Sequence, residues 1–298
     1  MDDAAMSSTF LSVKSALRRK LHWLGSGLAL IGVVFVAIRL HTYWLDLDFS
    51  RVTLPIWLSI AVFAVLYGLT NLLLASAWWH LLIHLGAPVT RRWSLKTYGI
   101  SQLAKYLPGN IFHLAGRQAL GMAAGIPAVI LAKSTLWELG LIALTGTLFG
   151  WLILPLLFPA YPEIASILLL LGSAGLIANI LQRMAGYQTA LAFIWQILFL
   201  MISGGIFVSL LGVIAGSEAI PAQLWLTIGG AYIVAWLTGL VTPGAPAGVG
   251  VREMILLLLL KGVMHEADLL MAILLGRLVT VAGDLLFFVF ASFIPTAK

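Results

Sequence analysis

The sequence predicts an all-α polytopic membrane protein with about seven full spans and two broken, re-entrant helical segments. The composition is 61% hydrophobic and 9% charged, and the mean hydropathy is +1.06. Apolar runs long enough to cross a bilayer core of about 30 Å recur along the chain. Two further apolar segments are interrupted by Pro-Gly pairs. A transmembrane barrel would instead alternate apolar and polar residues in segments of about ten.

Seven apolar runs are expected to span the membrane. They cover residues 21–40, 54–85, 128–158, 164–181, 190–215, 221–241 and 269–294. Because cytoplasmic loops carry an excess of Lys and Arg, the charge distribution predicts cytoplasmic N- and C-termini in a cytoplasmic (inner) membrane. The basic residues at predicted inner ends are Lys14, Arg18, Arg19, Lys20, Arg91, Arg92, Lys96, Arg183 and Lys298. We therefore divide the chain into a basic amphipathic segment, 1–20, and one transmembrane domain, 21–298.

Two interruptions share one pattern, KYLPGNIFHLAGR at 105–117 and TPGAPAGVGVRE at 242–253. In each, a Pro-Gly pair stands nine residues before an arginine: Pro108 and Gly109 before Arg117, and Pro243 and Gly244 before Arg252. Non-helical backbone at membrane depth is tolerated only inside protein or beside a wet cavity. Matching breaks in two halves of a chain are typical of transporters with an internal inverted repeat and a binding site between its halves. Two ordinary cytoplasmic loops are the alternative.

Nine ionisable residues lie inside the predicted spans or breaks, where each costs about 2.5–3.5 kcal/mol at a helix centre. Six are basic and three acidic: Lys105, Arg117, Lys133, Glu138, Arg252, Glu253, Lys261, Arg277 and Asp284. An anionic ligand would offset this basic excess, and guanidinium groups bind phosphate through paired hydrogen bonds. The alternatives are lysines that snorkel to the interface and internal ion pairs. The pairs expected are Arg277 with Glu253, or Asp284 with Arg252.

The predicted site binds a phosphate-type head group between the two interruptions. Lys105, Arg117 and Arg252 would contact the phosphate, and helix N-termini after the breaks would add N–H donors. Backbone could approach the ligand at Pro108, Gly109, Pro243, Gly244, Gly248 and Gly250. Further substrate contacts are expected from Tyr106, Asn110, His113, Glu253 and Arg277. Glu138 and Asp284 would complete a charge network. Whether these acidic residues also carry a coupling proton stays open.

No cofactor or metal site is expected. The chain has no cysteine, and His80 and His84 lack the glutamate of a zinc-binding HExxH helix. The basic residues are scattered among short loops and spans, which argues against nucleic-acid binding.

The motif KYLPGNIFHLAGR, the motif PAGVGVRE and the downstream Arg277 and Asp284 resemble the transmembrane domain of lysylphosphatidylglycerol synthases and its stand-alone, flippase-like relatives. The resemblance runs from about the second predicted span to the end of the chain. Two positions depart from the family pattern. Ala247 stands where the family usually has glycine, and Glu138 lacks the arginine that often follows it there. No aminoacyl-transfer domain follows the last span, so we expect a stand-alone member.

The resemblance implies a flippase or scramblase for a lipid with a phosphate-bearing head group, with or without an aminoacyl or sugar substituent. Two alternatives stay open. A membrane-embedded lipid-phosphate transferase would need an acid–base pair, for which His113 and Glu253 are the candidates near the breaks, but no catalytic constellation is found. An accessory scaffold would act with a lipid-modifying enzyme or a glycosyltransferase. The lipid itself, and whether the chain forms a homo-oligomer, also stay open.

Overall fold

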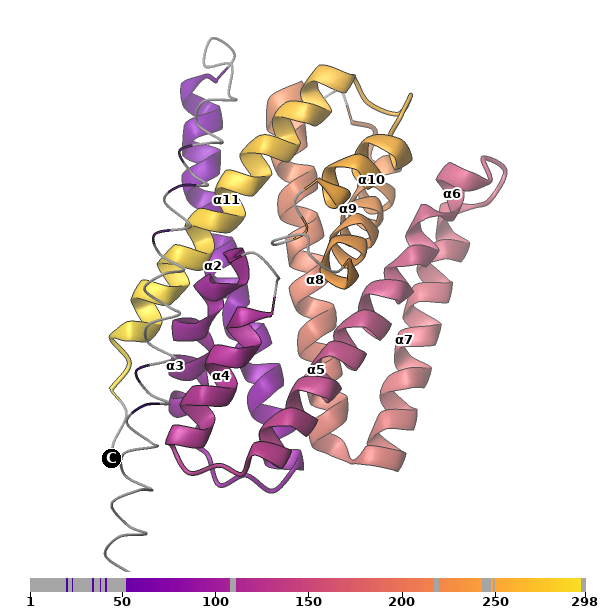
Figure 1. The fold of residues 1–298 in the computed structure, drawn as a ribbon. Helices are drawn as coiled ribbons and strands as arrows, with labels where there is room; N and C mark the ends of the chain where they lie inside the picture. The colour runs from indigo at the N-terminus through magenta and orange to yellow at the C-terminus, as the bar shows by residue number, and fades with distance from the viewer. Residues whose placement is uncertain are drawn as a thin grey trace, which may run out of the picture.

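The chain folds into a bundle of α-helices, shown in Figure 1. The computed structural model describes residues 52–107, 111–216, 220–242, 248 and 250–295, with single positions at 20, 23, 34, 38 and 41. The predicted amphipathic segment 1–20 and nearly all of the predicted first span, 21–40, lie outside the described residues. The same holds for Pro108, Gly109, Asn110, Pro243 and Gly244.

Six helices in the described part of the chain are long and apolar enough to cross a membrane. They are α2 (Leu54–His84), the segment Ala128–Leu157, α7 (Glu163–Ala185), α8 (Tyr187–Ala215), α9 (Leu224–Val241) and α11 (Glu266–Ser292). The segment Ala128–Leu157 comprises α5 (Ala128–Leu148), a 3₁₀ turn (Phe149–Ile153) and α6 (Leu154–Leu157). The all-α prediction is confirmed for these residues, and the six helices agree with a multi-pass membrane protein.

Local sequence signals set where these helices begin and turn. Pro55 occupies the first turn of α2, where its missing N–H costs nothing because helix-start N–H groups lack partners anyway. The Thr90 hydroxyl accepts a hydrogen bond from the Trp93 N–H at 3.2 Å and so caps the next helix. Gly186 stands between α7 and α8 with φ at +88°, a conformation that allows the chain to reverse direction.

Each predicted interruption lies between two helices, and of these four helices only α9 is long enough to cross a membrane. The first lies between α3 (Arg91–Gln102), extended by a 3₁₀ turn (Leu103–Tyr106), and α4 (Phe112–Ala123). The second lies between α9 and α10 (Val251–Leu259). In Figure 1 the α3–α4 hairpin occupies the lower half of the bundle and the α9–α10 hairpin the upper half. The hairpins therefore approach the middle of the bundle from opposite ends.

Close packing of α2 against α11 aligns the centre of the bundle. A methyl group added at Gly283 would lie 2.7 Å from the Ala64 carbonyl oxygen, and one added at Gly68 would lie 2.9 Å from the Gly283 carbonyl oxygen. Small residues at a helix crossing allow such backbone contact and are typical of membrane helix interfaces. The contact places Asp284 of α11 against Asn71 of α2, with 3.1 Å between the carboxylate and the amide nitrogen.

This crossing predicts that Gly283→Ala destabilises the protein. Overpacking costs about 1–3 kcal/mol, and no flexible side chain here can move aside because the obstructing atoms are backbone. The unfolding midpoint of detergent-solubilised protein, followed by tryptophan fluorescence, should fall by several degrees. The matched control is Gly172→Ala in α7, where nothing lies within 4 Å of the added methyl group. Equal midpoints for the two variants would contradict the close crossing.

Candidate functional site

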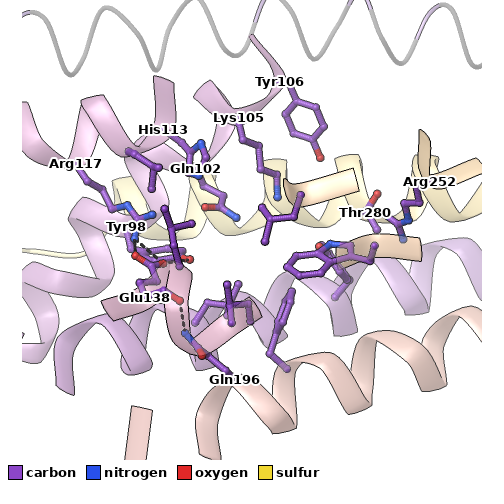
Figure 2. A pocket seen from close by; sticks show the side chains of 18 of the residues that line it. Tyr98, Gln102, Lys105, Tyr106, His113, Arg117, Glu138, Gln196, Arg252 and Thr280 are labelled. Atoms are coloured by element: carbon purple, nitrogen blue, oxygen red, sulfur yellow. Dashed lines mark hydrogen bonds and ion pairs between the residues drawn. The ribbon is translucent and has the colours of Figure 1, made fainter. Parts of the chain in front are cut away.

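A partly open cavity of about 100 Å³ lies inside the bundle and is lined by both hairpins. This volume is several times what one water molecule needs, so it can hold a group the size of a phosphate. Lys105 and Arg117 come from the first hairpin, Arg252 from the second and Arg277 from α11. Figure 2 shows Arg117 with Glu138 at one end of this cavity and Arg252 with Thr280 at the other.

Seven of the ten side chains predicted for the substrate site and the charge network line this cavity. Its lining includes Lys105, Tyr106, His113, Arg117, Glu138, Arg252 and Arg277. Asp284 and Glu253 are not part of that lining, but each is ion-paired with a residue that is. Residues 105–117 and 252–277 are far apart in the sequence, so only folding brings them together.

The first ion pair joins Arg117 of α4 to Glu138 of α5. The Arg117 Nη1 lies 2.9 and 2.8 Å from the two carboxylate oxygens, and the Tyr98 hydroxyl donates to the same carboxylate at 3.1 Å. The guanidinium also stacks on the Tyr98 ring, with 4.3 Å from its carbon to the ring centroid. Arg117 was expected to contact a head group. It lines the cavity, but its Nη1 group is already bound by Glu138.

The second ion pair joins Arg277 of α11 to Glu253 of α10 and was one of the two pairs expected. The Nε and Nη2 atoms of Arg277 lie 2.7 and 2.6 Å from Glu253 Oε1, and Nη2 also donates to the Gly248 carbonyl at 3.2 Å. The other carboxylate oxygen accepts from the Gly250 N–H at 2.6 Å, which caps the start of α10.

The third ion pair corrects the other expectation. Asp284 is bound to Lys105, with Nζ 2.7 Å from Oδ2, rather than to Arg252. Tyr106 and Asn71 also donate to this carboxylate, which is fully buried. The reason is geometric: the 3₁₀ turn that carries Lys105 and Tyr106 packs against the middle of α11, whereas Arg252 lies on the other hairpin.

Gly248 and Gly250 serve the packing of the second hairpin. Both have positive φ, +71° and +87°, which side-chain-bearing residues rarely adopt. A methyl group added at Gly248 would lie 2.8 Å from the Gly239 Cα of α9. Gly248 therefore lets the chain approach α9 closely, and the positive φ of Gly250 sets the start of α10, whose first residues include Arg252.

Arg252 differs from the other three cations of the cavity. It is only 7% exposed, yet no hydrogen bond or ion pair joins its guanidinium to any residue that the structure describes. Its one defined contact is with Tyr232, whose ring centroid lies 4.3 Å from the guanidinium carbon. Stacking on an aromatic face leaves the N–H groups at the guanidinium edge available to a ligand.

The structure also reduces the predicted basic excess. Lys133 and Lys261 are exposed, so they do not belong to the buried set. Four cations and three carboxylates remain, and each carboxylate is paired with a different cation. The excess is therefore one positive charge rather than three, and it resides on Arg252.

Several polar residues of the site were not singled out from the sequence. Asn71 and Gln196 lie within otherwise apolar helices, and a buried amide in such a helix is a signal that sequence reading could have used. Tyr98 and Tyr232 gave no such signal, because aromatic residues are common throughout the chain. Their role follows from tertiary contacts: an arginine stacks on each ring, and the Tyr98 hydroxyl also donates to Glu138.

Comparisons of the chain with family models, with curated proteins and with solved structures find no match. The resemblance to the transmembrane domain of lysylphosphatidylglycerol synthases therefore rests on the sequence motifs alone.

The buried Arg117–Glu138 pair predicts a non-additive stability effect. Glu138→Gln leaves Arg117 buried without a carboxylate, which costs about 3–5 kcal/mol. The double variant Glu138→Gln/Arg117→Gln removes both charges and should unfold at a higher temperature than Glu138→Gln alone. Lys133→Gln, an exposed position on the same helix, is the control and should leave the unfolding midpoint unchanged. A double variant that shows the sum of the two single effects would contradict direct pairing.

Proposed function

We propose that the protein moves a lipid with a phosphate-bearing head group between the leaflets of a membrane, as a flippase or scramblase. The observation that carries this proposal is Arg252, a buried cation that faces a cavity and has no carboxylate partner among the described residues. An unpaired charge inside a membrane domain is costly, so an anionic group bound beside it would lower the free energy. Arginine suits phosphate because its planar fork donates two parallel hydrogen bonds.

A lipid fits this cavity better than a free anion would. The cavity lies inside a bundle whose outer surface is strongly apolar, with large exposed side chains such as Leu58, Val62 and Leu69 on α2 and Leu168 and Leu171 on α7. Such faces suit contact with hydrocarbon. A head group could enter the partly open cavity while its acyl chains stay in the bilayer.

We also propose that the domain is an inverted repeat. Helices α2 to α5 and helices α8 to α11 share one order: a long helix, a broken hairpin and another long helix. The hairpins lie at opposite ends of the bundle, as inversion requires (Figure 1). In each unit one ion pair ties the second arm of the hairpin to the long helix that follows, Arg117 to Glu138 and Glu253 to Arg277. In the first unit the arginine lies on the hairpin and the glutamate on the long helix, whereas in the second unit these positions are exchanged.

This arrangement suggests how a head group could reach both sides. The second hairpin is held to α11 by the pair Glu253–Arg277, whereas the first hairpin is held to α5 by Arg117–Glu138 and to α11 by Lys105–Asp284. Movement of one repeat against the other would therefore have to break the Lys105–Asp284 pair, which joins the two repeats. Rocking of one repeat against the other would open the cavity to each side in turn, as in other transporters built this way.

The proposed location is the cytoplasmic (inner) membrane. Arg91, Arg92 and Lys96 at the start of α3 and Arg183 at the end of α7 lie near the lower end of the bundle, whereas Glu163, Glu266 and Asp268 begin helices at the upper end (Figure 1). By the positive-inside rule the lower end would face the cytoplasm.

A transferase is less well supported. Glu253, one of the two residues considered for acid–base work, is held by Arg277 and by the Gly250 N–H. A carboxylate committed to an ion pair is poorly placed to accept and release protons.

Arg252→Gln should slow lipid exchange by about 10- to 100-fold, because a hydrogen bond to a charged group contributes about 1.5–3 kcal/mol. The measurement is dithionite quenching of acyl-chain-labelled phosphatidylglycerol in proteoliposomes. Lys261→Gln, an exposed position just after α10, is the matched control and should exchange at the wild-type rate. Exchange by the wild type no faster than in protein-free vesicles, or an unchanged rate for Arg252→Gln, would overturn the proposal.

A further inference from the structure

We infer that the cavity selects head groups that carry one negative charge and free hydroxyl groups, and that it rejects head groups bearing an ammonium group. This inference rests on the proposed function and specifies its substrate class. It departs from the aminoacylated lipids that the sequence resemblance admits. Three observations carry it: the charge balance of the cavity, the pairing of its carboxylates and two buried polar atoms without partners.

The balance of charges around the cavity favours a head group with a single negative charge. Lys105, Arg117 and Arg277 are each neutralised by a carboxylate, so among the described residues that line the cavity the charge left uncompensated is that of Arg252. A phosphodiester carries one negative charge and would make the site neutral. A phosphomonoester with two negative charges would leave one uncompensated, and a zwitterionic head group would leave the site one charge positive. Uncompensated charges are costly where water is excluded.

The carboxylates offer nothing to an ammonium group. Glu138 is bound by Arg117 and Tyr98, and Glu253 is bound by Arg277 and the Gly250 N–H. Asp284 accepts from Lys105, Tyr106 and Asn71. An aminoacyl, choline or ethanolamine head group would therefore bring a second positive charge beside Arg252 without finding a free carboxylate among the described residues. That repulsion excludes it.

Two unpartnered atoms favour hydroxyl groups. His113 Nδ1 and Gln196 Oε1 are buried, belong to residues that line the cavity, and have no hydrogen-bond partner in the described part of the chain. The Gln196 amide nitrogen donates to the Glu138 carbonyl at 3.3 Å, so its oxygen is left as an acceptor. A buried acceptor without a donor is costly, and a glycerol or sugar hydroxyl would satisfy it.

Together these groups orient the ligand. The phosphate would lie towards Arg252, and the hydroxyl-bearing part would extend towards Gln196 and His113. Figure 2 shows Gln196 and Arg252 at separate positions around the cavity.

The test compares exchange of acyl-chain-labelled probes in proteoliposomes of the full chain. The probes are phosphatidylglycerol, phosphatidylcholine, lysylphosphatidylglycerol and, at alkaline pH, dianionic phosphatidic acid. We expect phosphatidylglycerol to exchange at least about ten-fold faster than each of the others, because only it neutralises the cavity. Exchange of phosphatidylcholine or lysylphosphatidylglycerol at the phosphatidylglycerol rate would overturn the inference and leave the proposed lipid movement standing.

Two charge variants make the test quantitative. Arg252→Gln removes the excess charge and should raise the phosphatidylcholine rate relative to phosphatidylglycerol. Glu253→Gln adds one positive charge and should raise the phosphatidic acid rate relative to phosphatidylglycerol. Lys261→Gln changes the net charge of the protein but not that of the cavity. It should therefore rank the exchange rates of the four lipids as the wild type does. If the wild type and all variants rank the exchange rates of the four lipids in the same order, the inference is overturned.

Binding separates the inference from the proposed function. Trp236 lines the cavity, so its fluorescence should report binding of dioctanoyl phosphatidylglycerol and of the deacylated head group glycerophosphoglycerol. Binding of both by the wild type, with at least ten-fold weaker binding by Arg252→Gln, supports the inference. If these probes bind but no lipid exchanges, charge selection holds and the proposed transport fails. If neither probe binds and no lipid exchanges, the inference and the proposed function both fail.

Discussion

The centre of this protein is governed by the requirement that charges inside an apolar bundle be balanced. Taking an ion out of water costs several kcal/mol even after relaxation, and only a partner at short distance offsets that cost. Three carboxylates and four cations meet between the hairpins, and three close pairs form between them at 2.6 to 2.8 Å. Each pair joins two separate elements. The same contacts that neutralise charge therefore also hold the 3₁₀ turn, α4 and α10 against the long helices.

The charge that is left over defines the site. In the described part of the chain Arg252 is held by stacking on Tyr232 of α9 rather than by a carboxylate, since the nearby Glu253 is already bound by Arg277. Stacking fixes the plane of the guanidinium without using its N–H groups. The result is an oriented cation beside a cavity. The inferred preference for one negative charge follows from this imbalance and does not depend on which lipid supplies it.

Several features of the protein were predictable from the sequence. Long apolar runs predicted the helices because burial in a bilayer needs about 20 apolar residues in succession. The Pro-Gly pairs predicted the two interruptions because proline removes an N–H donor and glycine weakens the helix. Charged residues within apolar segments predicted a polar centre. The Arg277–Glu253 pair was among the expected pairs, whereas Asp284 was assigned to Arg252 and binds Lys105 instead. The reason is that sequence spacing does not reveal which hairpin packs beside the middle of α11.

The amino-acid sequence by itself determined that the chain forms apolar helices, that two of the helical segments are broken and that ionisable side chains lie at the breaks. These properties are local, because they depend on composition and on residues close along the chain. Only the tertiary structure decided which charges neutralise one another and which cation stays unpaired. Pairing depends on distances of a few ångströms between residues as far apart in the chain as Lys105 and Asp284. Those distances are set by helix packing, including the backbone contact of Gly68 with Gly283.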